Sequence, residues 1–388
     1  DVSGFDYSKV YAASRKAADT LSKGVAYLLK KNGVTVITGT AVLESKNELL
    51  IDGVKKISAQ SIIVATGSRP RPIPGFEFDE NMVLSSNGAL LLQSLPKSIL
   101  IMGGGAIGVE FAHIMNSFGV KVHLVELMER ILPSEDTDIS DHLKKSFIKR
   151  GIEINTGTKA ISMHKKNDTV VVTLDKNGEL STVEVEKVLV VVGRIPNTVG
   201  LGLEKLGVEL EKGFVKVGKY NETSVQGIYA IGDVVATPLL AHVASKEGEI
   251  AVEHIAGDRT VARLDKNTIP GAVYCEPQVA SFGYTEAAAK QRGLEFQVAT
   301  FPYKGVGKSV AVGKSDGFLK LVFDSKTHEI LGAHIIGSEA TELLHEILLA
   351  KYTELLPEDV ATMIHAHPTM SEGVMELCRA AEGWAIHI

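Results

Sequence analysis

The chain has 388 residues, enough for two or three domains, and its 45% apolar and 23% charged residues are typical of a soluble globular protein. The net charge of −6 argues against nucleic acid as the main partner, because that partner would need a basic face. No apolar run reaches the length of a bilayer span and no signal-peptide pattern opens the chain, so no membrane partner is expected.

The start of the chain and its cysteines both bear on the compartment in which the protein is found. The sequence begins at Asp1 without an initiator Met, so we expect a processed or missing N-terminus. The two cysteines, Cys275 and Cys378, lie 103 residues apart and do not form a disulfide framework. The simplest interpretation of each is a small buried hydrophobic residue in a reducing compartment. Cytoplasm, or mitochondrial matrix in a eukaryote, is therefore expected.

The clearest local pattern is a βαβ unit over residues 99–126. An apolar strand at 99–102 precedes a G-x-G-x-x-G turn, which is followed by an apolar helix at 109–118 and a second strand at 120–125. Its glycines allow a tight turn and close approach of a pyrophosphate, and the helix N-terminus supplies N–H donors. A glycine-rich loop without a ligand is the minor alternative, because strands flank the fingerprint on both sides.

An acidic residue ends the second strand of this unit. Glu126 lies 18 residues past Gly108, where a carboxylate accepts hydrogen bonds from the ribose hydroxyls of a dinucleotide. A 2′-phosphate at the same place would meet a like charge. The pattern therefore favours NAD over NADP.

A repeat appears when the chain is compared with itself. Residues 33–75 and residues 151–200 contain the same features in the same order. Each has a strand, the sequence Thr-Gly-Thr, an alternating β-meander, an apolar strand and a final segment that contains glycine, arginine and proline. Chance similarity between two β-rich segments is the weaker interpretation, because four features keep their order. The repeat predicts two dinucleotide-binding domains.

The repeat also predicts where the first fingerprint would fall. Gly103 lies 48 residues before Gly151, and the counterpart of Gly151 in the first copy is Gly33. The same spacing places the first phosphate-binding turn at position −15, before Asp1. We therefore expect the first nucleotide domain to be incomplete in this chain.

A short buried strand near 227–231 ends in Gly232-Asp233. An Asp at the carboxyl end of a strand in an α/β sheet points into the ligand crevice, although an Asx-turn or a helix cap explains it equally well. A periodic helix should follow and end near Ile255. Residues 264–388 then predict a separate α+β domain, with strands at 277–283, 296–301 and 318–324 and helices near 341–355, from Pro357 and at 370–381.

The C-terminal region holds a candidate acid–base pair. His367 is followed five residues later by Glu372, and a carboxylate bonded to one imidazole nitrogen raises the basicity of the other. Such an imidazole could take a proton from a thiol. From the residues alone a capping box, with Thr369 as N-cap and Glu372 at N3, is the better explanation of Glu372. His365 and His367 could equally be satisfied, partly buried histidines.

Taken together, these motifs resemble the pyridine nucleotide–disulfide oxidoreductases and, within that family, the dihydrolipoamide dehydrogenase group. The resemblance runs over essentially the whole chain and rests on motifs at residues 65–70, 103–110 with 126, 193–197, 229–235, 239–242 and 365–372. The last motif is the most specific. Glutathione reductase-like members usually lack the preceding His-Ala and bind NADP, and mercuric reductases carry extra C-terminal cysteines.

The resemblance implies an α/β fold with two Rossmann-like FAD- and NAD-binding domains, the first incomplete, and a C-terminal α+β dimerisation domain. The implied boundaries are 1–72 and 197–263 for the two parts of the FAD domain, 73–196 for the NAD domain and 264–388 for the dimerisation domain. The residues implied to contact FAD are Ala41, Thr66, Gly67, Ser68, Asp233, Leu239, Leu240, Ala241 and His242. Those implied to line the NAD site are Gly103, Gly104, Gly105, Ala106, Ile107, Gly108, Val109, Glu110, Glu126, Ala160 and Gly193.

The implied activity is oxidation of protein-bound dihydrolipoamide, with electrons passing through a disulfide and FAD to NAD+. His367 would be the acid/base, oriented by Glu372, and would act on the disulfide of the partner subunit in a homodimer. The family's Cys-x4-Cys pair would fall upstream of Asp1, because neither Cys275 nor Cys378 can replace it. Lipoyl domains of 2-oxo-acid dehydrogenase or glycine-cleavage complexes would be the partners. An NADH-dependent reductase of another disulfide or quinone, and a shortened non-catalytic dimerising relative, are the alternatives.

Overall fold

The computed structural model describes residues 4–258 and 264–387. The chain divides into two compact units. The first combines residues 1–71, 87–95 and 193–264, and the second combines 72–86, 96–192 and 265–388. The mixed α/β architecture confirms the predicted fold class. The three predicted boundaries between these domain segments stay predictions.

The first unit begins with α1 (Tyr7–Lys31), whose N-cap Asp6 accepts a hydrogen bond from the Ser8 backbone N–H. None of the residues of α1 is buried. The rest of the unit is built from a three-stranded antiparallel meander and three two-stranded pairs. Its remaining elements are β1 (Ala41–Ser45), β2 (Glu48–Ile51), β3 (Lys55–Ser58), β4 (Ile62–Val64), β5 (Ser68–Pro70), β14 (Arg194–Pro196), η1 (Glu204–Leu206), β15 (Leu210–Glu211), β16 (Phe214–Val215), β17 (Ile228–Ala230), η2 (Gly232–Val234) and α5 (Ala241–Ile255).

Two strand pairings organise this unit. β17 runs parallel to β4, with Tyr229 opposite Ile63, and β14 runs antiparallel to β5. Apolar side chains of β4 and β17 form the core together with Leu203, Val208 and Val234. The predicted strand before Gly232 and the helix ending at Ile255 are confirmed. The short helix α2 (Ser86–Leu90) crosses the boundary between the two units.

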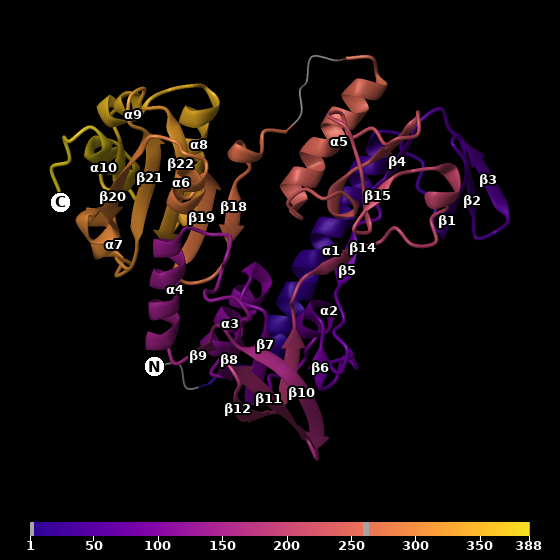
Figure 1. Cartoon of the computed structure of the whole chain (residues 1–388), viewed down its shortest axis with the longest axis horizontal. Helices are drawn as coiled ribbons and strands as arrows, with labels where there is room; N and C mark the ends of the chain where they lie inside the picture. Colours follow the sequence, from indigo (N-terminus) through magenta and orange to yellow (C-terminus); the bar gives the residue numbers. More distant parts are fainter. Residues whose placement is uncertain (1–3, 259–263, 388) are drawn as a thin grey trace. The chain divides into compact units, whose positions relative to one another are not determined.

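In the second unit, a five-stranded parallel sheet holds the predicted βαβ unit (Figure 1). The sheet order is β6 (Val83–Leu84), β13 (Lys187–Val190), β7 (Ser98–Met102), β8 (Lys121–Val125) and β9 (Glu153–Asn155). α3 (Ala106–Ser117) joins β7 to β8, and α4 (Thr137–Lys149) joins β8 to β9. The β-meander of β10 (Lys159–Lys166), β11 (Thr169–Lys176) and β12 (Glu179–Val185) is inserted before β13.

The C-terminal part of the second unit is a five-stranded antiparallel sheet with helices, coloured orange to yellow in Figure 1. Its order is β18 (Gly271–Val273), β19 (Gln278–Gly283), β22 (Ile330–Gly337), β21 (Phe318–Asp324) and β20 (Phe296–Pro302). α8 (Ala340–Tyr352) lies against β22 and β19, and α10 (Glu372–Ala381) lies against β20 and β21. The remaining elements are η3 (Lys266–Thr268), α6 (Glu286–Gln291), η4 (Tyr303–Gly305), α7 (Gly307–Ala311) and α9 (Pro357–Thr362). The strands and helices predicted for this region are confirmed within one to three residues.

One predicted element is wrong. The first copy of the repeat was expected to open with a strand near residues 34–38, but these residues are exposed and form no strand. Their counterpart β9 is held by parallel pairing with β8. A strand is stable only when a neighbour pairs with it, and no strand in the described ranges pairs with residues 34–38. The rest of the repeat is confirmed, since both copies contain a meander followed by an apolar strand and an antiparallel exit.

Candidate functional site

The glycine turn between β7 and α3 is shaped by contacts that leave no room for side chains. Gly103 has a φ of 111°, and a Cβ placed on it would lie 2.5 Å from the Val191 carbonyl oxygen. A Cβ on Gly108 would lie 1.8 Å from the carbonyl oxygen of Gly103. Gly105, the N-cap of α3, differs because a Cβ there would meet nothing within 4 Å. The turn is therefore closed toward the sheet and open at the helix N-terminus, which is the side a pyrophosphate would approach.

Glu126 lies directly after β8 and is only 8% exposed. Its Oε2 accepts the Gly104 backbone N–H at 2.6 Å, and its Oε1 accepts the Met128 N–H at 2.7 Å. The carboxylate is thus fixed against the glycine turn. Each carboxylate oxygen can accept a second hydrogen bond, so both remain able to bind ribose hydroxyls.

The other predicted NAD residues take different positions. Val109 is fully buried, so only its backbone can contribute. The Glu110 carboxylate accepts the Tyr274 backbone N–H at 2.9 Å, which joins α3 to the segment after β18. Burial raises the pKa of Glu110, and this hydrogen bond offsets part of the rise. Ala106 and Ile107 form the first turn of α3, and Ala160 lies in β10 opposite Leu174.

Gly193 belongs to the first unit, where its φ is 124° and its carbonyl accepts the Arg71 N–H at 3.1 Å. It marks the entry into β14, whose Arg194 reaches the predicted FAD residues. The contribution of Gly193 to the NAD site stays a prediction.

Ser68 and Asp233 are brought together by the parallel pairing of β4 with β17, which places the carboxyl ends of both strands side by side. The Ser68 hydroxyl donates to Asp233 Oδ2 at 2.5 Å. Arg194 donates from Nε to Ser68 Oγ at 2.6 Å and from Nη2 to the Ser68 carbonyl at 2.9 Å. The Arg194 Nε lies 3.5 Å from Asp233 Oδ2. Arg194 thus completes a charged cluster, a role that the sequence motif did not assign to it.

The neighbouring predicted residues are held by backbone contacts. Thr66 and Asn197 exchange two hydrogen bonds, Thr66 Oγ1 to the Asn197 carbonyl at 2.7 Å and Asn197 Nδ2 to the Thr66 carbonyl at 3.0 Å. Gly67, with a φ of 69°, makes the turn between β4 and β5. Ala41 is the exposed first residue of β1.

α5 begins at Ala241, after the Gly232-Asp233 turn and the segment 234–240. Leu240 is its N-cap, Leu239 precedes the cap, and Ala241 and His242 form its first turn. The buried Glu247 of the same helix accepts the Gly232 backbone N–H at 2.6 Å. Burial raises the pKa of Glu247, and this hydrogen bond opposes the rise. The sequence offered no signal for Glu247, because nothing in the spacing links it to Gly232.

The C-terminal pair is formed as predicted. His367 Nδ1 lies 3.0 Å from Glu372 Oε1, and the His367 side chain is 77% exposed. Within the described ranges the other ring nitrogen has no hydrogen-bond partner. Burial alone would raise the pKa of Glu372, but the Thr369 N–H and His367 hold it below its usual value. An ionised carboxylate beside an accessible imidazole is the arrangement of an oriented general base.

The predicted capping box is only half formed. Glu372 Oε2 accepts the Thr369 backbone N–H at 2.9 Å, as a residue at N3 should. The Thr369 hydroxyl, however, donates to the Ala366 carbonyl at 2.7 Å and caps no helical N–H. α10 begins at Glu372 itself. Glu372 therefore contacts His367 through Oε1 and the Thr369 N–H through Oε2, so the two interpretations of this residue are compatible.

Both cysteines are free and buried. Burial raises the pKa of Cys275 to about 12 and that of Cys378 to about 12. A thiol attacks as the thiolate, so neither is a nucleophile at neutral pH. The interpretation of both as small core residues is confirmed.

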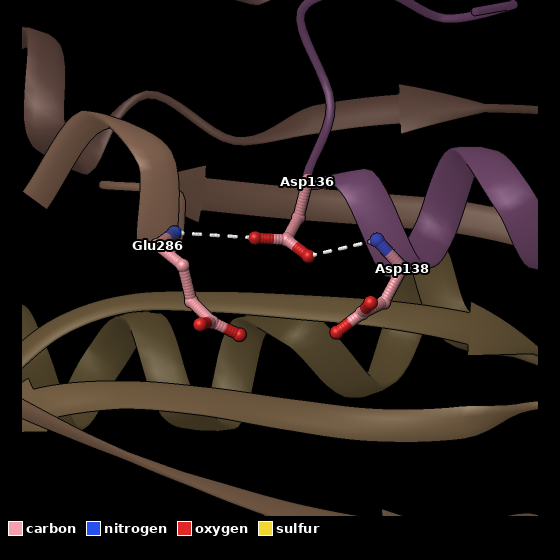
Figure 2. Close-up of side chains that lie close together, drawn as sticks. All are labelled: Asp136, Asp138 and Glu286. Carbon is pink, nitrogen blue, oxygen red and sulfur yellow. Dashed lines mark hydrogen bonds between the residues drawn. The ribbon is translucent and has the colours of Figure 1, made fainter. Parts of the chain in front are cut away.

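Three carboxylates gather where α4 and α6 begin (Figure 2). Asp136 accepts the backbone N–H of Asp138 at 3.1 Å and that of Glu286 at 3.2 Å. Their side-chain oxygens are close enough to hold a metal ion, but the Lys320 ammonium lies among them, 2.7 Å from Asp136, 2.6 Å from Asp138 and in contact with Glu286. Lys320 is 1% exposed. The cluster is therefore an ion-pair network in which the ammonium takes the position a cation would need.

Glu126 fixed beside the glycine turn, the cluster of Ser68, Asp233 and Arg194, and the exposed imidazole of His367 are features of a nicotinamide-dependent oxidoreductase. The chain belongs to the pyridine nucleotide-disulphide oxidoreductase family, whose model matches residues 3–248, and the dimerisation domain of that family matches residues 269–378. This confirms the family resemblance found in the sequence.

Curated relatives cover nearly the whole chain. A dihydrolipoyl dehydrogenase of Bacillus subtilis is 40% identical over 98% of this chain and 83% of the relative. One from Mycobacterium bovis is 41% identical over 99% of this chain and 83% of the relative. Among solved structures, LpdA from Mycobacterium tuberculosis superposes with a TM-score of 0.90 at 27% identity, covering 97% of this chain and 83% of that one. The flavoprotein disulfide reductase RclA from Escherichia coli gives 0.89 at 27% identity, covering 96% and 86%. None of the described helices is long and apolar enough to span a membrane.

Proposed function

We propose that the protein is a dihydrolipoyl dehydrogenase, which oxidises protein-bound dihydrolipoamide to lipoamide and reduces NAD+. The observation that carries this proposal is the exposed His367, fixed through Nδ1 by Glu372. Oxidation of a dithiol to a disulfide releases two electrons and two protons. NAD+ takes up a hydride, so one proton must be accepted elsewhere, and an imidazole with a near-neutral pKa suits that task.

The residues present fit NAD. The glycine turn is open at Gly105, where a Cβ would meet nothing, and the N-terminus of α3 supplies backbone donors for a pyrophosphate. Glu126, fixed beside Gly104, would accept the ribose hydroxyls and repel a 2′-phosphate. Backbone and side chain thus have separate roles. The backbone N–H groups of the turn would donate to the phosphates, and the Glu126 side chain would favour NAD over NADP.

The residues present also fit FAD. Ser68, Asp233 and Arg194 form a partly exposed polar cluster at the carboxyl ends of paired strands, which is where α/β sheets bind ligands. When bound, FAD supplies the two-electron chemistry that links thiols to nicotinamide. In the proposal, Asp233 and Ser68 hold and orient this cofactor together with Thr66, Gly67 and residues 239–242.

His367 is proposed to take the proton of the substrate thiol on Nε2 and to release it to solvent after electron transfer. Glu372 keeps the proton of neutral His367 on Nδ1 and stabilises the imidazolium that forms. The thiol exchange is not assigned to Cys275 or Cys378, because burial keeps both protonated.

A homodimer is proposed for the intact enzyme, supported by the match to the family's dimerisation domain. Lipoyl domains of 2-oxo-acid dehydrogenase or glycine-cleavage complexes are the proposed partners, supported by the curated relatives at about 40% identity. A cytoplasmic location is proposed, supported by the bacterial sources of those relatives and by two cysteines that remain free.

The experiment compares substrates on the flavin-loaded enzyme. Steady-state rates are measured with dihydrolipoamide and NAD+, and with NADH and either glutathione disulfide or a quinone. The proposal expects the highest kcat/KM for dihydrolipoamide. A higher value for another disulfide or a quinone would favour the second reductase hypothesis, and protein that binds no flavin would favour a non-catalytic dimerising relative.

A further inference from the structure

A second histidine–glutamate pair lies two residues before His367. His365 Nε2 is 2.6 Å from Oε1 of Glu346, a residue of α8, and His365 Nδ1 is 3.3 Å from the Met363 carbonyl oxygen. The His365 side chain is only 3% exposed, whereas that of His367 is 77% exposed. The two histidines of the His-Ala-His sequence therefore occupy opposite environments.

His365 attaches a segment that is exposed at residues 363, 364 and 366–368 to a rigid element. Residues 363–371, between α9 and α10, form no helix or strand, and Ile364 is 95% exposed. α8, in contrast, packs on β22 and β19 and contributes Leu344 and Ile347 to the domain core. Through Glu346, the segment that carries His367 is tied to this core helix.

The partners of His365 determine its protonation. A backbone carbonyl oxygen only accepts hydrogen bonds, and so does an ionised carboxylate. His365 faces one of each, so both contacts are hydrogen bonds only when both ring nitrogens carry protons. His365 would then be an imidazolium, and its charge would be balanced by Glu346.

Glu372 and Cys378 of α10 are titratable groups that interact with this pair. Burial alone would raise the pKa of Glu372, but the Thr369 N–H, His367 and the nearby His365 lower it. The Cys378 thiol is buried, and the negative charge of Glu346 adds to the effect of burial in raising its pKa. The positive His365 thus lies between two carboxylates, Glu346 in direct contact and Glu372 farther away.

We propose that His365 is a positioning residue for the acid–base chemistry: as an imidazolium bound to Glu346, it fixes the segment from which His367 projects. This inference rests on the proposed function, because it takes His367 as the base. His365 acts by anchoring the segment that carries His367 to Glu346 of α8, so that the Nε2 of His367 meets the thiol at a constant place.

The test uses Glu346→Gln in the flavin-loaded enzyme, because glutamine keeps the size of the side chain but removes its charge. We expect kcat for dihydrolipoamide, per bound flavin, to fall about 10-fold with KM changed less than about 2-fold, since misplacing a reacting group lowers the rate more than binding. NADH oxidation by ferricyanide, which needs nicotinamide and flavin but no thiol, should not change. A merely structural role would lower both activities together through loss of active enzyme.

A matched control is Glu382→Gln, which disrupts the His328–Glu382 pair of the same domain at 2.9 Å. Neither activity should change in this variant. If Glu346→Gln does not fold, His365→Gln serves instead, because its amide can still donate to Glu346 but carries no charge. The same selective loss of lipoamide turnover is expected.

An independent measurement is ¹⁵N NMR of the histidine side chains at pH 7. We expect two protonated ring nitrogens for His365 in the wild type and a neutral ring in Glu346→Gln. A neutral single tautomer in the wild type, or an unchanged ratio of lipoamide to ferricyanide activity in Glu346→Gln, would overturn the proposal. If His367→Gln turns over lipoamide normally, the proposed base itself is wrong. If His367→Gln is impaired and Glu346→Gln is not, only the positioning role fails.

Discussion

His367 and Thr369 share one carboxylate: Glu372 Oε1 lies 3.0 Å from His367 Nδ1, while Glu372 Oε2 accepts the Thr369 backbone N–H at 2.9 Å. One oxygen orients the imidazole and the other fixes the start of α10. The first residue of α10 therefore contributes to the orientation of the base.

Glu372→Gln should separate these two roles. The amide oxygen can still accept the Thr369 N–H, but the NH₂ group then faces His367 Nδ1 and forces the proton onto Nε2. We expect lipoamide turnover to fall about 100-fold, within the range for loss of a general base, while the melting temperature hardly changes. Glu372→Ala should lose the turnover and, in addition, about 1 kcal/mol of stability, because the cap is gone. Equal melting temperatures for the two variants would contradict the shared role.

The lowered pKa of Glu372 predicts a dependence of stability on pH. A carboxyl group whose pKa is lower in the folded state stabilises the fold above its unfolded pKa, about 4.3 for Glu, and loses this contribution as the pH falls through the folded value. The stability difference between wild type and Glu372→Ala should therefore be constant near pH 7 and shrink below about pH 4. Denaturant unfolding at several pH values measures it, and a difference that grows toward acid would contradict the assignment.

The glycine turn offers a matched pair of substitutions. Gly108→Ala places a Cβ 1.8 Å from the Gly103 carbonyl oxygen, so the turn must move, and both stability and NAD binding should fall. Gly105→Ala meets nothing within 4 Å and needs no unusual φ, so stability should stay the same. Its methyl group would lie on the open side, and we expect the Kd for NAD to rise about 10-fold. Calorimetric titration with NAD+ checks both, and unchanged affinity in Gly105→Ala would refute the placement of the pyrophosphate.

Glu126 should determine the choice of nucleotide. Glu126→Gln replaces one acceptor oxygen by an NH₂ group, which weakens the binding of the ribose hydroxyls, and it removes the repulsion of a 2′-phosphate. The ratio of kcat/KM for NAD+ to kcat/KM for NADP+ should fall about 10- to 100-fold, mainly because the KM for NAD+ rises. A ratio equal to that of the wild type would show that selection lies elsewhere.

The ion-pair network around Lys320 predicts a large cost when its cation is lost. Lys320→Met leaves Asp136, which is 2% exposed, as a buried carboxylate without its partner, and about 3–5 kcal/mol of stability should disappear. The matched control Asp138→Asn should cost about 1 kcal/mol or less, because Asp138 is 58% exposed. Urea unfolding measures both. Added Ca²⁺ or Mg²⁺ should not stabilise the wild type, and a stabilising ion would contradict the network.

The parts of this molecule that sequence predicts well are those whose causes are local. The turn from Gly103 to Gly108 follows from glycine spacing, and Asp233 follows from the end of an apolar strand. The strand expected near residues 34–38 did not form, because a strand depends on a pairing neighbour that its own residues do not specify. The periodic pattern is the same as that of β9, but only β9 has a partner.

Contacts between distant residues are the part that spacing cannot predict. His365 and Glu346 meet because α8 packs on the C-terminal sheet, and the sequence pattern around either residue does not indicate the other as its partner. Arg194 reaches Ser68 through the pairing of β14 with β5. Lys320 lies on a strand with apolar neighbours, where a single charge gives no sign of the carboxylates that surround it.

The central claim is that His367 is the acid–base group for thiol oxidation, and His367→Gln tests it most directly. Dihydrolipoamide turnover and NADH–ferricyanide turnover are measured on the same flavin-loaded preparation, each per bound flavin. The account predicts a loss of lipoamide turnover of about 100-fold or more, with ferricyanide turnover and flavin content unchanged. Lipoamide turnover equal to that of the wild type would contradict it.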